Sequence, residues 1–116
     1  MDKLFEQSLL YDFYGELLTE HQREVYEGYV FDNLSLGEIA SEQGISRQGV
    51  HDLIKRCDGI LKGYEEKLHL VHRFMTAKEK ASQIEELTDK SKDEALSMDE
   101  RLQRIKELVD QLMEDF

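Results

Sequence analysis

The sequence LGEIASEQGISRQGVHDLIKR, residues 36–56, has the pattern of two short helices joined by a tight turn. Ala40 is small enough for the helices to approach closely, and Gly44 can adopt the positive φ that the turn requires. Ser35 and Ser46 stand where each helix should begin, and serine is a good N-cap. Four apolar side chains are expected to form the shared core: Ile39, Ile45, Val50 and Leu53. The segment therefore predicts a helix-turn-helix.

The second helix of this motif presents polar side chains where such motifs contact nucleic acid. Arg47 and Gln48 fall in its first turn, where arginine can pair with guanine and glutamine with adenine. Lys55 and Arg56 are expected to hold phosphate, and Ser46 can offer its hydroxyl or backbone N–H to another phosphate. The predicted nucleic-acid-binding residues are Ser46, Arg47, Gln48, His51, Lys55 and Arg56.

Two residues of the same helix argue against this interpretation. Asp52 adds a repulsive charge on nearly the same face, and Gly49 removes a side chain that would read a base. The alternative is a surface helix with ordinary solvated charges, or a motif used for contacts with protein. Both interpretations remain open from the residues alone.

The charge of the chain weakens the expectation of strong DNA binding. The net charge is −11, divided as −3 over residues 1–18, −3 over residues 19–63 and −5 over residues 64–116. Because no segment is basic overall, sequence-independent attachment to DNA is disfavoured. We expect a weak or partner-assisted reader of nucleic acid.

Helices are also predicted before the motif. In the first, of about fifteen residues, Phe5, Leu9, Phe13 and Leu17 recur every four residues and form an apolar stripe, with Leu10, Tyr14 and Leu18 beside it. In the second, Thr19 and Gln22 form a capping box, and Val25, Tyr26, Tyr29 and Val30 follow as its apolar residues.

After the motif, helical spacing of apolar residues continues as far as Met75. Gly59 and Gly63 interrupt it, and each glycine costs about 1 kcal/mol relative to alanine inside a helix. These glycines predict either a break or bend in the helix or a close contact with another helix.

The C-terminal part begins with a polar stretch over residues 88–97, predicted to be a linker or turn. Ser97 and Glu100 form a further capping box. A narrow apolar seam that requires a partner helix follows, made of Leu102, Ile105, Val109, Leu112 and Phe116. That partner can belong to the same chain or to a second copy.

These patterns together predict an all-α helical bundle that contains the helix-turn-helix, a long following helix and a C-terminal helix. The expected division is a helical domain over residues 1–63, a helical extension over 64–87, the linker over 88–97 and the C-terminal helix over 98–116.

Other classes of function find little support. Cys57 is the single cysteine, which excludes an intrachain disulfide and favours a reducing, cytoplasmic setting; it lies among core positions rather than in a nucleophile's surroundings. His69 and His72 are three residues apart on a predicted helix, but further zinc ligands are not evident. There is no catalytic motif, phosphate-binding loop or long apolar segment. We expect no enzyme, cofactor, metal site or membrane insertion.

Two family resemblances extend this interpretation. Residues 18–56 resemble the DNA-binding fourth region of bacterial sigma factors. A closer resemblance covers nearly the whole chain: LYDFYGELLTEHQ, SLGEIASEQGISRQGVHDLIKR and LKGYEEKLHLV are similar to the YlxM family of small proteins from Gram-positive bacteria. The resemblance is less diagnostic after about residue 88.

The YlxM resemblance implies a helix-turn-helix regulator that takes part in the signal recognition particle pathway. It also implies contact with the particle's GTPase, with the receptor of that GTPase, or with the small cytoplasmic RNA of the particle. Acidic composition favours an alternative, an adaptor that engages basic components of this machinery without binding nucleic acid. The apolar stripes of the first and last helices make a homodimer a third hypothesis.

Overall fold

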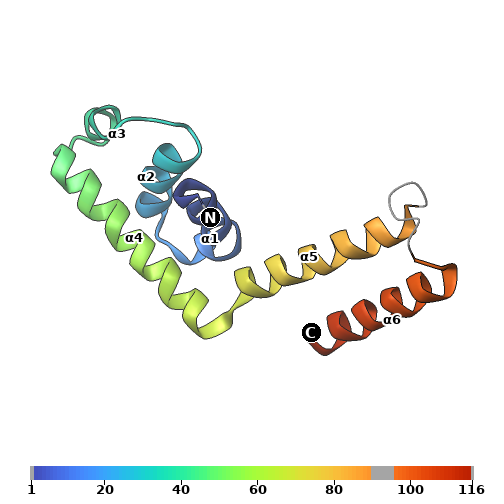
Figure 1. Cartoon of the computed structure of the whole chain (residues 1–116). Helices are drawn as coiled ribbons and strands as arrows, with labels where there is room; N and C mark the ends of the chain where they lie inside the picture. The colour runs from blue at the N-terminus through green and yellow to red at the C-terminus, as the bar shows by residue number, and fades with distance from the viewer. Residues whose placement is uncertain (1, 90–95, 116) are drawn as a thin grey trace. The chain divides into compact units, whose positions relative to one another are not determined.

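The computed structural model describes residues 2–89 and 96–115, which form α-helices and one short 3-10 helix (Figure 1). The elements are α1 (Lys3–Tyr14), η1 (Gly15–Leu17), α2 (Glu20–Val30), α3 (Leu36–Gln43), α4 (Arg47–Leu68), α5 (Leu70–Thr88) and α6 (Met98–Asp115). This confirms the predicted all-α fold. The chain divides into two compact units, Met1–Val71 and His72–Phe116. Residue 63, the expected end of the first domain, lies inside α4.

The long helix α4 organises the first unit, because α1, α2 and α3 all pack against it. Its buried residues recur at helical spacing, so one stripe of α4 faces the other helices and the opposite face remains in solvent (Figure 1). The most deeply buried side chains of this core are Leu10, Tyr14, Val25, Tyr26, Ile39, Val50, Cys57 and Leu61. Burying each large apolar side chain contributes roughly 1.5–3 kcal/mol.

The partly buried carboxylate of Asp58 fixes how α4 is rotated against its neighbours. Gln7 of α1 donates from Nε2 to Oδ1 of Asp58 at 3.0 Å, and the Tyr26 hydroxyl of α2 donates to the same oxygen at 2.6 Å. Burial, followed by the hydrogen bond to Asp58, raises the pKa of Tyr26. Because these bonds depend on where Asp58 points, they also determine which face of α4 is exposed.

The predicted break at Gly59 or Gly63 does not occur. Both residues lie inside the continuous helix α4, and a Cβ atom added to either would meet no atom within 4 Å, so no close helix contact requires them. Burial of Cys57 and Leu61 beside them keeps this part of the chain helical despite the low helix propensity of glycine.

The helix ends at His69 instead, which adopts a left-handed conformation with φ 57°. The Tyr14 hydroxyl accepts the N–H of Leu70 at 3.1 Å and donates to Glu65 at 2.6 Å. Glu65 in turn accepts the N–H of Val71 at 2.9 Å. Two side chains therefore satisfy N–H groups at the start of α5. His69 and His72 were predicted to lie on one helix, but His69 lies between α4 and α5 and only His72 is helical.

The apolar stripe predicted for the first helix is only partly correct. Leu9 is buried, as are Leu10, Tyr14 and Leu18, but Phe5, Phe13 and Leu17 are 39–56% exposed. The helix ends at Tyr14 and continues as η1, which displaces Leu17 from the α-helical spacing. The inner face therefore follows the neighbouring positions 10, 14 and 18.

In the second unit, the inner face of α6 is rotated from the predicted seam. Leu108 and Arg101 are buried, whereas Leu102 and Val109 are 56% and 43% exposed. Nη1 of Arg101 donates to the carbonyl oxygens of Leu87 at 3.4 Å and of Asp89 at 3.3 Å. A guanidinium that binds these carbonyls at the end of α5 brings position 101, rather than 102, to the inner face.

The other predictions for this unit concern its ends. The Ser97–Glu100 capping box is confirmed, since Ser97 Oγ accepts the Glu100 N–H at 3.2 Å and Glu100 accepts the Ser97 N–H at 3.4 Å. Lys80 and Asp115 form an ion pair at 2.7 Å. Most of the predicted linker, residues 90–95, and Phe116 lie outside the described residues.

Candidate nucleic-acid interface

The turn between α3 and α4 has the geometry that the sequence predicts. Gly44 has φ 68° and ends α3, donating its N–H to Ala40, and a Cβ atom added to it would meet no atom within 4 Å. Glycine is therefore needed here for its backbone conformation and not for space. Ser35 caps α3 in a reciprocal box with Glu38, and Ser46 caps α4 by accepting the Gly49 N–H at 2.9 Å. The helix-turn-helix is present.

The two helices of the motif are held together by a small apolar core. Ile39, Ala40, Val50 and Ile54 are buried. Leu53 is half-buried, and Ile45, which was expected in this core, is 37% exposed. Ile45 lies in the turn after the left-handed Gly44 rather than on a helix face, which explains its partial exposure.

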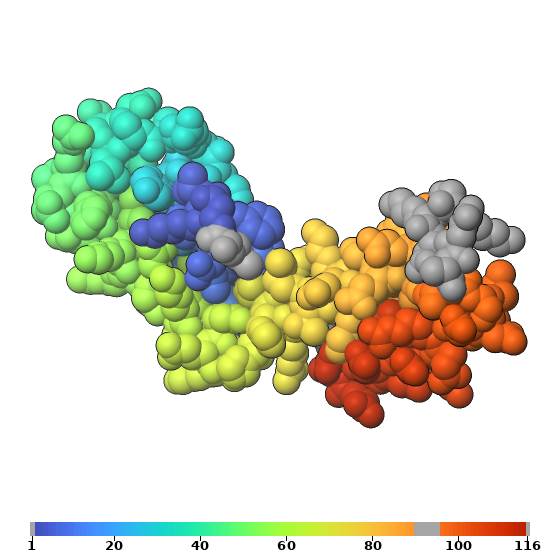
Figure 2. All heavy atoms as spheres, viewed as in Figure 1, coloured from blue at the N-terminus to red at the C-terminus, as the bar shows by residue number. Residues whose placement is uncertain are grey.

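All six predicted contact residues are exposed: Ser46, Arg47, Gln48, His51, Lys55 and Arg56. Ser46 lies at the N-cap. Gln48, His51, Lys55 and Arg56 lie on the side of α4 away from the buried Val50 and Ile54, because helical side chains repeat every 3.6 residues. Arg47 is seven residues before Ile54, so it lies at the edge of the buried stripe, beside α3. The segments that carry them adjoin α3 on the surface of this unit (Figure 2, cyan to green). The structure thus exposes all six predicted residues, four of them on the outer side of α4 and Arg47 beside α3.

This face is positively charged within an acidic unit. Residues 46–56 carry three bases and one acid, a net charge of +2. Residues 1–71 as a whole contain seven bases and fourteen acids, a net charge of −7. Basic side chains are therefore concentrated where the motif would meet phosphate.

Arg47 extends over the first helix of the motif. A Cβ atom added to Gly37 of α3 would lie 3.7 Å from Nε and 4.0 Å from Cδ of Arg47. The guanidinium therefore lies close to the N-terminal turn of α3, where the helix dipole also favours an anion. Glycine at position 37 leaves this path open.

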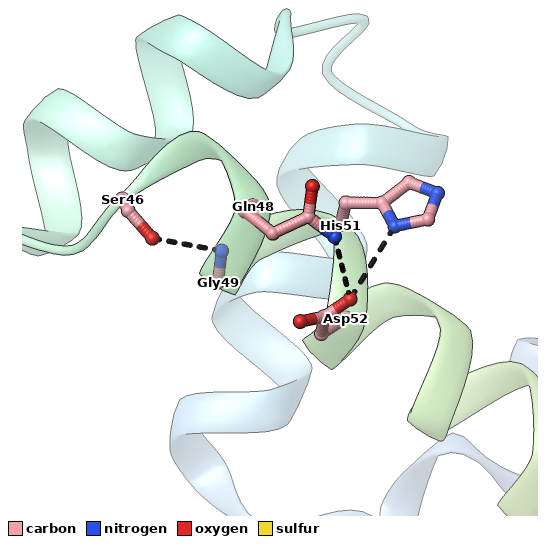
Figure 3. A network of polar contacts seen from close by, with 5 residues as sticks. All are labelled: Ser46, Gln48, Gly49, His51 and Asp52. Carbon is pink, nitrogen blue, oxygen red and sulfur yellow. Dashed lines mark hydrogen bonds and ion pairs between the residues drawn. The ribbon is translucent and has the colours of Figure 1, made fainter.

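Asp52 forms a polar network with two of the predicted residues (Figure 3). Gln48 donates from Nε2 to Oδ1 of Asp52 at 2.9 Å, and Nδ1 of His51 lies 3.6 Å from the same oxygen. From the sequence, Asp52 is expected only to repel nucleic acid. The spacing of four residues between Gln48 and Asp52 is the signal that would have found this bond, because such residues are neighbours on a helix.

The remaining chemistry-bearing residues have structural surroundings. Cys57 is fully buried, and burial followed by the charge of Asp58 raises the pKa of its thiol to about 11, so the thiolate that a nucleophile needs is disfavoured. No group of three metal-ligating side chains occurs among residues 2–89 and 96–115. None of the described helices is long and apolar enough to cross a bilayer.

Comparison with known proteins places these features in a family. The family model described as "Putative helix-turn-helix protein, YlxM / p13 like" matches residues 1–101. The chain belongs to this YlxM family. The YlxM-like protein of Acetivibrio thermocellus is 46% identical over 118 residues, covering 98% of this chain and 99% of that protein. YlxM of Bacillus subtilis is 44% identical over 94 residues, covering 81% of this chain and 86% of its own length.

Membership confirms the resemblance to the YlxM family and the helix-turn-helix on which it rested. A further relative from Halalkalibacterium halodurans is 47% identical over 90 residues, covering 78% of this chain and 83% of that protein. The matched region of the family model includes all six predicted contact residues. It stops within α6, which agrees with the weaker resemblance of the C-terminal residues.

Proposed function

We propose that this YlxM-family protein is a regulatory module that binds double-stranded DNA through the first turns of α4. The observation that carries the proposal is the exposed basic face of residues 46–56 on a unit that is otherwise acidic. An α-helix fits the major groove of B-form DNA but not the narrow major groove of A-form RNA. Duplex DNA is therefore the target that this helix suits best.

In this proposal the residues divide into two roles. Gln48, in the first turn of α4, reads a base edge, with His51 one turn further along. Arg47, Lys55 and Arg56 supply positive charge for phosphates or for a guanine, and the Ser46 hydroxyl can donate to a phosphate at the N-terminus of α4. Each good bidentate contact discriminates by about 1–3 kcal/mol, whereas phosphate contacts carry no sequence information.

A titration of fluorescent duplex DNA with the full chain tests this function. We expect saturable binding that weakens as salt rises, and Arg47→Ala should reduce affinity about 5- to 150-fold, the equivalent of a lost contact of 1–3 kcal/mol. A structured RNA hairpin serves as the second probe. Saturable binding of the hairpin alone would favour the particle RNA that the family resemblance implies, and would contradict the preference for duplex DNA.

The alternative function is an acidic adaptor of the signal recognition particle pathway that modulates its GTPases. It is favoured by a cleft of about 280 Å³ between α2 and α3, lined by Glu24, Glu27, Asp32 and Glu42 among other residues. Carboxylates gathered at one cleft suit a basic protein segment. Retention of the chain by purified GTPase or receptor, together with changed GTP hydrolysis, would support it; no change in hydrolysis would refute it.

We also propose that the second unit forms a homodimer. Met98, Leu102, Val109 and Met113 of α6 are 43–75% exposed, and they repeat at steps of four, seven and four residues along one side of the helix. Such a stripe is unusual on a small monomeric helical unit and fits a second helix. A monomer mass by light scattering at all micromolar concentrations would contradict dimerisation.

A further inference from the structure

We infer that Asp52 is a positioning residue for base recognition, which fixes the Gln48 amide so that it reads adenine. The inference rests on the proposed binding of duplex DNA by α4. It assigns to a carboxylate on the contact face a role that simple charge counting would exclude.

The first step is the geometry of the bond. Nε2 of Gln48 donates to Oδ1 of Asp52 at 2.9 Å across one turn of α4 (Figure 3). Both residues are exposed, so this bond is not a requirement of burial. A free glutamine side chain samples many rotamers, and a neighbour that holds it in one of them lowers the entropy lost on binding.

The second step concerns what the bond leaves available. The amide of Gln48 has two N–H donors and one carbonyl acceptor, and Asp52 uses a single donor. One N–H and the carbonyl remain, and adenine needs both: N7 accepts, and N6–H donates. Because Asp52 holds the nitrogen side of the amide, nitrogen and oxygen cannot exchange places without breaking the bond.

The third step concerns the bases that are rejected. Guanine presents two acceptors, N7 and O6, in the major groove. A carboxylate on the reading face repels acceptors and phosphates alike. Asp52 therefore weakens binding to every duplex, and it weakens binding most where guanine faces Gln48. Asp52 therefore lowers the affinity for DNA and raises the discrimination between adenine and guanine.

Two substitutions separate the hydrogen bond from the charge. In Asp52→Asn the side-chain carbonyl can still accept from Gln48, but the negative charge is lost. In Asp52→Ala both are lost. Asp12→Ala is the matched control, because Asp12 is an exposed aspartate of α1 that lies outside the contact face.

The experiment uses the full chain and a pool of 20-base-pair duplexes with a randomised centre, sequenced before and after binding. We expect the wild type to prefer adenine at one position by about 5- to 100-fold, as one bidentate contact allows. Asp52→Asn should bind all duplexes more tightly and keep the part of the preference that comes from the hydrogen bond, while discriminating less against guanine because the charge is lost. Asp52→Ala should also bind more tightly but should lose most of the preference, and the Asp12→Ala control should change neither property.

The outcomes distinguish the inference from the function on which it rests. Absence of saturable binding by the wild type would refute the proposed function and the inference with it. Binding without a base preference, or a preference that Asp52→Ala retains, would overturn the role of Asp52 and leave DNA binding intact. Circular dichroism of each variant verifies that α4 is still folded, since a glutamine–aspartate pair of this spacing makes only a small contribution to helix stability.

Discussion

Replacing Tyr14 with phenylalanine tests how the junction between α4 and α5 is held. The substitution removes a single oxygen from a side chain that is 1% exposed, and it leaves the packed ring in place. That oxygen accepts the Leu70 N–H at 3.1 Å and donates to Glu65 at 2.6 Å. Glu65 keeps its bond from the Val71 N–H at 2.9 Å.

The expected magnitude follows from the groups that lose their partner. An N–H at a helix start that loses its acceptor costs about 1–3 kcal/mol if it stays buried, and less if water replaces the acceptor. We therefore expect local opening at Leu70 to become roughly 5- to 150-fold more frequent. The left-handed His69 should become less well fixed, because the first N–H of α5 no longer has a partner.

Amide hydrogen exchange measured by NMR is the appropriate assay, because it reports the junction without assuming that both units unfold together. Tyr64→Phe is the matched control: the Tyr64 ring stacks on Tyr14 with centroids 6.0 Å apart, but within the described residues its hydroxyl has no hydrogen bond. Exchange at Leu70 should accelerate in Tyr14→Phe alone. Equal rates in the two variants would refute the role of the Tyr14 hydroxyl.

Three further predictions concern the turn, the core thiol and the dimer. Gly44→Ala should destabilise the fold by about 1–2 kcal/mol because φ is 68° there, whereas Gly59→Ala, in the interior of α4, should stabilise it by about 0.5–1 kcal/mol; thermal melts that show the same sign for both would contradict this. Folding raises the pKa of the Cys57 thiol from about 9 to about 11. The protonated thiol therefore contributes about 2–3 kcal/mol to the unfolding free energy below pH 9, and this contribution is lost as the pH rises towards 11. In urea melts between pH 9 and pH 11, Cys57→Ala should lose less unfolding free energy than the wild type. Some loss should remain, because the pKa of Tyr26 is raised as well. A pH profile identical to that of the wild type would exclude a contribution from Cys57. Leu102→Glu should lower the mass seen by light scattering if α6 forms the dimer, while Gln103→Glu, the adjacent exposed position, should leave it unchanged.

The parts of the fold that were predicted correctly depend on local chemistry. The capping residues Thr19, Ser35, Ser46 and Ser97 act on N–H groups three residues away, and all four caps are present. The turn at Gly44 was also predicted correctly, because a positive φ is a local property that glycine adopts without strain. Such features need only a short window of sequence.

The features that were missed depend on partners distant in the chain. The helix break at His69 is held partly by Tyr14, which lies 55 residues earlier, while burial of Cys57 and Leu61 overrides two glycines that would otherwise weaken α4. The inner face of α6 follows from Arg101 reaching the end of α5. Apolar periodicity placed the correct helix but could not choose between adjacent faces.

The candidate site shows the same division. Helical spacing alone predicts that Gln48, His51, Lys55 and Arg56 share the outer side of α4, and all four are exposed there. Arg47, seven residues before Ile54, is exposed at the edge of the buried stripe instead. The path of Arg47 over Gly37 was not predictable from spacing, because it depends on how closely α3 and α4 approach.

The central claim, that the basic face of α4 binds duplex DNA, is tested most directly by the salt dependence of binding. Fluorescence anisotropy of a 24-base-pair duplex would be measured between low and moderate salt for the wild type, Lys55→Ala and Lys67→Ala. Lys67 is the control, an exposed lysine in the last turn of the same helix. We predict saturable wild-type binding, a salt slope reduced by about 1 in Lys55→Ala, and an unchanged slope in Lys67→Ala. No saturable binding at low salt, or equal slopes for all three proteins, would contradict the account.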